Sequence, residues 1–435
     1  MVMAQGADAA DTLVSESISL GVSCRMGVLE DSERAESRDV GVRAIIGQSQ
    51  AFVSGSTTDE AGLTRLSERV VDMARAALPD PYCGLAPKTL LAQDSLTLGA
   101  TLDLADPHEA SAKDLLAAAI ETEDTARAHK GITNSEGAHA SWGKSTTALV
   151  SSEGFAAEES GTSFSLSCAV LAGQGQNMQR DYAIHRTRYL ADLETPSIIG
   201  NRAAQRTIER MNPRKVKSQK APVFFSTRVS SSLLGHLAGA ISGAAVARGT
   251  SFLRDALDTQ IMPDHIQIID DPHRVRGLGS SAFDGEGVAP ACLQPVQDGR
   301  LTTWFLDCST ARQLDTKSNG RAARGIGGPP SPAPTNLYMQ EGTRPHDALL
   351  ADMDEGFYVT ELIGMGVNGV TGDYSRGASG FWVEGGKLAF PVSEITIASN
   401  LKEMFMNMTP AQDLQFRGGV NAPSLLIESM TLAGL

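Results

Sequence analysis

The sequence ISLGVSCRMGV, residues 18–28, alternates without a break between apolar residues and polar or small residues. A period of two places successive side chains on opposite faces of a β-strand, so this stretch predicts a strand with one buried face. The alternation returns at Val40, Val42, Ala44 and Ile46, after an acidic segment that is typical of a turn. We therefore expect the chain to open with two strands.

Helices and further strands follow in the first half of the chain. A capping-box spacing at residues 57–60 precedes apolar residues that recur every three or four positions, which predicts an amphipathic helix. Further helices are predicted at residues 111–131 and 198–211, with antiparallel strands at residues 132–189 between them. Together these elements predict an N-terminal α/β domain over residues 15–211, in which a curved sheet has helices on one side.

A basic segment, RKVKSQK at residues 214–220, predicts an exposed linker between two halves. After it come a predicted strand at residues 222–226, a small-residue helix at residues 232–247 and a strand-rich remainder with a strand at residues 301–306. We expect a C-terminal β-rich, barrel-like domain of peptidase type over residues 221–435, with the helix at its centre. The fold class predicted for the whole chain is α+β.

Charge and hydropathy exclude several classes of protein. Lys and Arg number 37 and Asp and Glu number 51, and 37 − 51 gives a net charge of −14. A negative excess of this size disfavours nucleic acid as a partner, because phosphate binding needs a basic surface. No apolar run approaches the roughly 18 residues that span a bilayer, and no secretory signal is visible at the start. A protein of the cytoplasm, with neither a nucleic acid nor a membrane as its partner, is expected.

No catalytic motif stands out. The chain has five cysteines, and no two of them form a Cys-x-x-Cys pair, so a disulfide framework or a cysteine-rich zinc site is not expected. None of the eight histidines lies three to five residues from another, so no helical histidine pair for zinc exists.

Two segments nevertheless have a composition that could serve binding. Asp284 and Glu286 lie in an acidic turn, where they could hold a cation or a peptide amine; a turn stabilised by an Asp side chain is the alternative. Residues 364–377 contain five glycines, which suits backbone contact with an extended peptide strand and equally suits tight packing of twisted strands. The candidate peptide or partner contacts in this segment are Gly366, Asn368 and Gly369.

The sequence resembles the PmbA/TldE branch of the TldD/PmbA family. The resemblance is carried by several motifs in the same order and covers most of the chain, from about residue 17 to the end. These motifs are SLLGHLAGAISG at 232–243, TSFL at 250–253, FDGEGV at 283–288, PAPTNLY at 332–338, GMGVN at 364–368 and GFWVE at 380–384.

The TldD-type partners in this family are zinc peptidases, with a His-Glu-x-x-x-His motif on a helix and a further Cys ligand near the C-terminus. Laid on this sequence, the motif falls on Leu234, Gly235 and Gly239, and residues 417–422 contain no Cys. His236 lies on a different helical face from the first ligand position and cannot simply replace that ligand. The resemblance therefore implies no catalytic residue and no metal in this chain, with zinc in the partner subunit.

The resemblance implies a TldE/PmbA-type subunit that pairs with a TldD-type zinc metallopeptidase to cleave unfolded or extended peptides. Small residues along the helix let a backbone or a partner approach closely, so His236 and Ser242 are further candidate contacts. Two alternatives stay open: a metallopeptidase active in its own right, and a regulatory binding protein of the gyrase-modulator type. In isolation, a second copy of the chain is an alternative partner.

Overall fold

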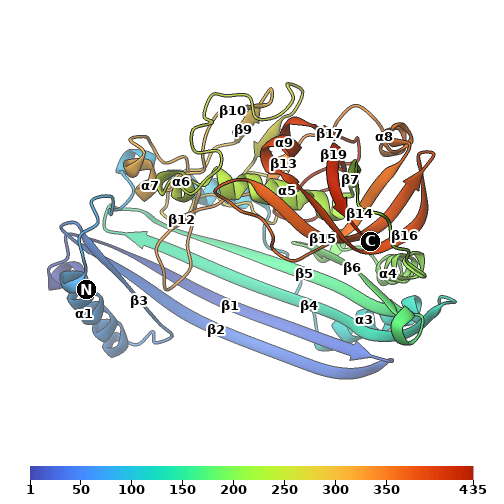
Figure 1. The fold of residues 1–435 in the computed structure, drawn as a ribbon. Helices are drawn as coiled ribbons and strands as arrows, with labels where there is room; N and C mark the ends of the chain where they lie inside the picture. Colours follow the sequence, from blue (N-terminus) through green and yellow to red (C-terminus); the bar gives the residue numbers. More distant parts are fainter. Residues whose placement is uncertain (435) are drawn as a thin grey trace.

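The first half of the chain forms a six-stranded antiparallel sheet in the order β3-β2-β1-β4-β5-β6 (Figure 1). The computed structural model describes residues 1–434, apart from the side chain of Gln176. The strands are β1 (Ala9–Arg25), β2 (Val28–Ile46), β3 (Ser49–Gly55), β4 (Ile132–Ser151), β5 (Ala156–Ala172) and β6 (Gln179–Thr187). Four of them have 17 to 20 residues, long enough for the sheet to curve around the rest of the molecule.

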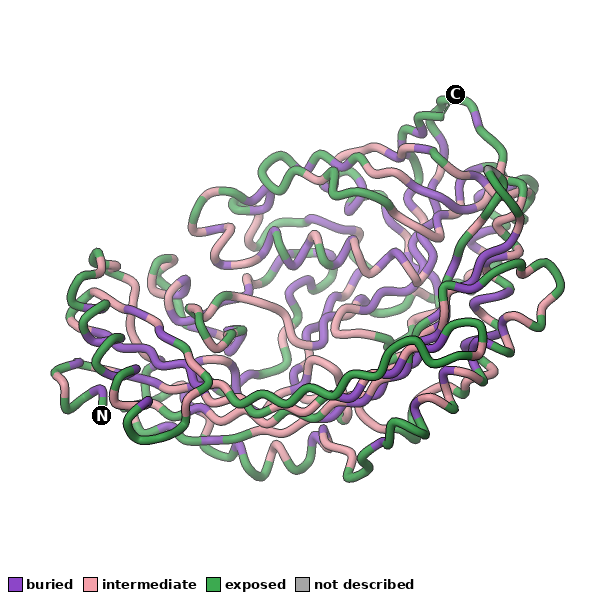
Figure 2. The backbone as a smooth tube through the Cα atoms, turned by 90° about the horizontal axis from the view of Figure 1, so that it is seen from below, coloured by how far each residue is buried: buried purple, intermediate pink, exposed green. Residues whose placement is uncertain are grey.

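Three of the four helices in this half cover one face of the sheet. Leu20 and Val22 of β1 lie in the core beneath α3 and α4, and α1 packs on β2 and β3. The opposite face curves around the second half of the chain (Figure 2), and there Leu102 of α2 shares a core with Leu13 of β1. The helices are α1 (Glu60–Ala76), α2 (Ser95–Leu102), α3 (Ala112–Arg127) and α4 (Pro196–Glu209), with 3-10 turns at Met3–Gln5, Lys88–Leu90, Gly175–Asn177 and Leu190–Asp192.

The prediction that the first strand continues through residues 26–28 is wrong. Met26 (φ 53°) and Gly27 (φ 74°) form the turn between β1 and β2, and the acidic segment predicted as a turn is the first half of β2. There Ser37 lies opposite Ser17, and β3 pairs only with the later part of β2. This half of β2 is an exposed edge that is polar on both faces, so no hydrophobic alternation marks it as a strand.

The second half contains a closed barrel of five strands in the order β16-β15-β14-β7-β19, closed by pairing of β16 with β19. β17 extends this sheet beyond β19, a second sheet has the order β10-β9-β8-β13-β18, and β11 pairs with β12. The fold prediction, α+β with a curved sheet and a barrel-like second part, is confirmed. The strands are β7 (Gln219–Phe225), β8 (Ile268–Asp270), β9 (Leu293–Gln297), β10 (Arg300–Leu301), β11 (Ala322–Ala323), β12 (Ser331–Pro332), β13 (Leu337–Met339), β14 (Gly356–Ile363), β15 (Asp373–Glu384), β16 (Lys387–Asn400), β17 (Met408–Pro410), β18 (Val420–Asn421) and β19 (Leu425–Ala433).

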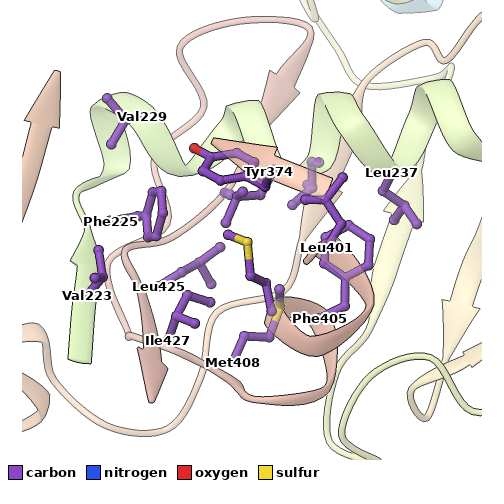
Figure 3. Packing of buried hydrophobic residues seen from close by; sticks show 14 of the residues in the cluster. Val223, Phe225, Val229, Leu237, Tyr374, Leu401, Phe405, Met408, Leu425 and Ile427 are labelled. Carbon is purple, nitrogen blue, oxygen red and sulfur yellow. The ribbon is translucent and has the colours of Figure 1, made fainter. Parts of the chain in front are cut away.

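Helix α5 (Thr227–Ala240) packs its apolar side on the barrel. Val229 and Leu237 share one core with Phe225 of β7 and Leu425 of β19, as Figure 3 shows. Burial of each such side chain contributes about 1.5–3 kcal/mol, which fixes the helix against the barrel. The other helices are α6 (Gly243–Ala247), α7 (Cys308–Gln313), α8 (His346–Met353) and α9 (Leu401–Met406).

Three element boundaries differ from their predictions. The N-cap of α1 is Asp59, whose side chain accepts from the Gly62 N–H at 2.6 Å, so the capping box at residues 57–60 is wrong. The helix predicted at residues 232–247 begins at Thr227 and is broken between α5 and α6, where the Gly243 N–H donates to the Phe305 carbonyl at 2.8 Å instead of to the preceding turn. The strand predicted at residues 301–306 is reduced to β10, because Leu306 and its neighbours bond to loop residues instead.

Contacts between the two halves are extensive. Asp11 of β1, which is 3% exposed, accepts hydrogen bonds from Arg43 of β2 (Nε, 2.8 Å) and from Arg324 (Nη1, 2.7 Å). Arg324 belongs to the Gly- and Pro-rich segment 320–334, and the Ile326 carbonyl lies directly on Gly41 of β2. The two guanidinium groups offset the cost of burying the carboxylate. The segment at residues 320–334 is therefore an ordered connection between the halves.

The basic segment at residues 214–220 packs on the barrel. Val216 is buried in the barrel core, the Arg214 guanidinium lies 4.5 Å from the centre of the Phe390 ring, and Lys215 pairs with Glu394. Its other residues are exposed, as expected of a linker. Among residues 1–434, no helix combines the length and apolar composition needed to cross a membrane.

Candidate functional site

The side of α5 that faces away from the barrel carries glycines at two successive turns, and we call this side the bare face of α5. Gly235 and Gly239 are exposed, and a Cβ atom at either position would meet no atom within 4 Å. They lie one turn apart on the same side of the helix as Ser231. Leu234, in contrast, is 1% exposed and packs in the barrel core. Two of the three positions assigned to the zinc motif therefore face open space, and one faces the core.

His236 is half-buried beside the barrel. Its ring centre lies 6.0 Å from that of Tyr374, edge to face, and its Nε2 atom has no hydrogen-bond partner. Burial, with a smaller contribution from Arg376, lowers the pKa of His236, so the imidazole is neutral at pH 7. Ser242, the other candidate on this side, is the N-cap of α6 and pairs through its backbone with Phe305.

These residues do not fit a zinc site. Leucine and glycine side chains have no donor atom, and His236 is a single imidazole with no carboxylate or thiolate beside it. Within residues 1–434, no group of three or more His, Cys, Asp or Glu side chains is arranged to hold a metal ion. We derive no chemical step through a metal in this chain.

Asp284 and Glu286 are buried and bonded to backbone. Asp284 accepts from the N–H groups of Glu286 and Val288 (2.9 Å each) and of Ala322 (3.1 Å), and Glu286 accepts from the Cys308 N–H at 2.7 Å. Burial, then the charge of Glu286, raises the pKa of Asp284 to about 7, and burial also raises the pKa of Glu286. These contacts are those of a turn stabilised by an Asp side chain, one of the two interpretations of the sequence.

The Gly-rich segment at residues 364–377, which we expected to be a strand, is a loop up to residue 372. Strand β15 begins only at Asp373, and the loop before it turns on Asn368, whose Oδ1 atom accepts from the Val370 N–H at 2.9 Å. A side chain at Gly366 would overlap the Ser375 carbonyl, whereas Gly369 is nearly free of contacts. The sequence pattern could not separate strand from loop because glycine carries no periodic side-chain signal.

Sequence reasoning missed a pocket of about 840 Å³ between the two halves. It lies between β6, α4, the first turns of α5 and the segments at residues 278–279 and 415–422, and none of the described residues that line it is acidic. We call it the arginine pocket, after the residues Arg186, Arg188, Arg202, Arg206, Arg228 and Arg417. A partial signal was present, since arginines at a spacing of two at the end of β6 and of four on α4 are expected to share a face.

One carboxylate already binds at the edge of the arginine pocket. Glu194 accepts two hydrogen bonds from Arg202 (2.7 and 2.8 Å) and one from Arg417 (3.2 Å). Arg202, with a smaller contribution from Arg417, lowers the pKa of Glu194 to about 2. Behind the pocket wall, Asp181 pairs with Arg228 at 2.6 Å and with Arg210 at 3.1 Å.

Three arginines of the pocket form no ion pair with a described residue, and one of them, Arg188, donates to three backbone carbonyls instead. Arg206 donates only to the Tyr182 carbonyl, at 3.2 Å, and burial together with nearby Arg228 lowers its pKa to about 10. Arg186 is exposed, and its side chain has no hydrogen bond or ion pair in the part of the chain that the structure describes. The pocket therefore keeps unneutralised positive charge in a protein of net charge −14.

Comparison with known proteins agrees with this architecture. Family models of the PmbA/TldA metallopeptidases match domain 1 at residues 10–74, the central domain at residues 105–211 and the C-terminal domain at residues 218–434. The metalloprotease PmbA of Escherichia coli O157:H7 is 38% identical over 98% of this chain and 92% of its own length. A PmbA homologue of Haemophilus influenzae is 34% identical over the same shares.

Solved structures show the same fold. A Bacteroides thetaiotaomicron protein described as a modulator of DNA gyrase has a TM-score of 0.90 and 25% identity, with 100% of this chain and 96% of that chain covered. TldE from Thermococcus kodakarensis has a TM-score of 0.85 and 18% identity, with 99% and 98% covered. The chain belongs to the PmbA/TldD family of metallopeptidases.

Proposed function

We propose that this chain is a TldE/PmbA-type subunit, which lacks a zinc motif and pairs with a TldD-type zinc metallopeptidase to cleave unfolded or extended peptides. The observation that carries the proposal is the bare face of α5. Gly235 and Gly239 leave open space where the peptidases of the family place part of their zinc motif. Helix position and fold are kept, while the donor atoms that zinc and its water need are missing.

The inner face of the curved sheet supports an extended peptide as the substrate. Many of the side chains that it turns toward the second half of the chain are serines, which are small and polar, so that a backbone can approach those parts of the sheet closely. They include Ser15, Ser17, Ser19 and Ser23 of β1, Ser141 and Ser145 of β4, and Ser163, Ser165 and Ser167 of β5. Hydroxyl groups bond to peptide amides whatever the side chains of the peptide are.

The loop between β14 and β15 supports a protein partner. Met365 is 90% exposed and Val370 55% exposed, and both lie on a loop whose backbone is held by Asn368. Large apolar side chains on an ordered loop are typical of protein interfaces. We propose that the TldD-type subunit, which would hold the zinc, contacts this loop.

Co-expression with a TldD-type subunit tests the proposal. We expect a stable complex that cleaves an unfolded peptide but not a folded protein of the same sequence, and no cleavage by this chain alone. Cleavage by this chain alone at the rate of the complex would instead favour a peptidase active in its own right.

A further inference from the structure

We infer that the arginine pocket binds a carboxylate group of an extended peptide and so makes this subunit select peptides that bring a carboxylate to this position. The inference rests on the proposed function and adds a substrate class to it. The carboxylate comes either from the C-terminus of the peptide or from an Asp or Glu side chain, and the experiment below separates these sources.

The binding chemistry is already visible in the pocket. Glu194 shows that the guanidinium groups of Arg202 and Arg417 are oriented for a carboxylate, since Arg202 binds it through both terminal nitrogens. Arg186 and Arg206 present the same chemistry without a partner carboxylate. Arg206 is partly buried without a counter-charge, which is unfavourable, so an anionic ligand would relieve that cost.

The position of the pocket connects it to the peptide path. Thr227 and Ser231 of α5 line the pocket, and Ser231 lies on the same side of the helix as Gly235. Four helical residues span about 6 Å along the axis, which corresponds to about two residues of an extended peptide. A peptide along the bare face of α5 would therefore bring its next residues into the pocket.

The other pocket residues favour a peptide over a bare inorganic anion. Tyr182 and Ile184 of β6 are 36% and 51% exposed at its wall, where they can contact the aliphatic part of a peptide residue. Gly418 and Gly419 on the facing loop leave their backbone accessible. A volume of about 840 Å³ holds several residues of a peptide, far more than one phosphate ion.

Peptide binding to the purified chain tests the inference. Four fluorescent, unstructured decapeptides are compared by anisotropy: a neutral peptide amide, the same peptide with a free C-terminal carboxylate, the amide with one internal Glu, and the amide with one internal Gln. We expect at least one carboxylate peptide to bind tenfold or more tightly than its neutral counterpart, with the advantage weakened by salt. The preferred carboxylate peptide identifies the source of the anion.

A double variant, Arg186→Gln with Arg206→Gln, should abolish this preference while leaving the melting temperature unchanged or higher. The matched control, Arg65→Gln with Arg69→Gln, makes the same charge change on the exposed side of α1 and should keep the preference. Equal binding of carboxylate and neutral peptides by the natural protein, or equal loss in both double variants, would overturn the inference. So would a single-stranded oligonucleotide that binds through Arg186 and Arg206 when no acidic peptide does.

The result is separable from the test of the proposed function. A complex that cleaves acidic and neutral peptides equally would remove the inference and leave the proposed function intact. Carboxylate binding by a chain that never supports cleavage would remove the proposed function and leave the anion site.

Discussion

Glu194 shows how single residues shape the region between the two halves of the molecule. It precedes α4 and binds Arg202 of that helix and Arg417 of the second half, so one carboxylate connects two segments far apart in the sequence. Its pKa of about 2 means that the folded protein keeps it ionised to a much lower pH than the unfolded chain does.

Replacement of this residue, Glu194→Gln, should lower stability in a pH-dependent way. The pKa is lower in the folded state, so the carboxylate contributes stability above pH 4.5, and that contribution is lost as the pH falls toward about 2. We expect a loss of about 1–2 kcal/mol at pH 7, since the group is partly exposed, and a shrinking difference below pH 4.5. Urea unfolding at several pH values from 7 to 3 measures this difference in the free energy of unfolding. The control is Glu68→Gln, at an exposed position of α1. A difference that stays constant over this range would contradict the assignment.

At the scale of elements, the sequence predicted the strands and helices whose side chains are buried periodically, and it missed the segments without such a period. β1 was predicted because Leu20, Val22 and Cys24 face the core beneath α3, whereas the first half of β2 has solvent on both faces. The bare face of α5 was predicted in part, because small residues are visible in a sequence. The arginine pocket was not, since its residues come from five segments that only the folded chain brings together.

The contact between the segment at residues 320–334 and β2 can be tested at Gly41. Gly41→Ala would place a methyl group on the Ile326 carbonyl and push this segment away from the sheet. We expect a loss of about 2–4 kcal/mol in the free energy of unfolding. Gly99→Ala is the matched control, because Gly99 lies inside α2 with no atom within 4 Å of a new Cβ, and it should stabilise by up to about 1 kcal/mol. Equal effects of the two substitutions would show that the contact at Gly41 is not tight.

The loop between β14 and β15 allows a separate test of where the proposed partner subunit binds. The double variant Met365→Ser with Val370→Ser removes two exposed apolar side chains, so the isolated chain should keep its stability within about 0.5 kcal/mol. Affinity for the TldD-type subunit should fall tenfold or more, as measured by titration of the labelled subunits. Leu78→Ser, which removes an 89% exposed side chain beyond α1, should leave affinity unchanged. An unchanged affinity of the double variant would place the partner elsewhere.

At the scale of the whole molecule, a long curved sheet holds a closed barrel whose helix turns its bare face away from the core. The two halves are joined by buried ionic contacts at Asp11 and by Glu194, which supports their action as one unit. We propose that this framework, without zinc ligands of its own, supplies a wall and a binding surface to an active partner.

The zinc content of purified chains tests this central claim most directly. Mass spectrometry with an inductively coupled plasma, after dialysis, gives zinc per chain for the isolated protein and for its complex with a TldD-type subunit. We predict well under one zinc per isolated chain and one zinc per pair in the complex, because α5 offers no donor atoms at Leu234, Gly235 and Gly239. One zinc per isolated chain that is lost in His236→Ala, or two zinc ions per pair, would contradict it.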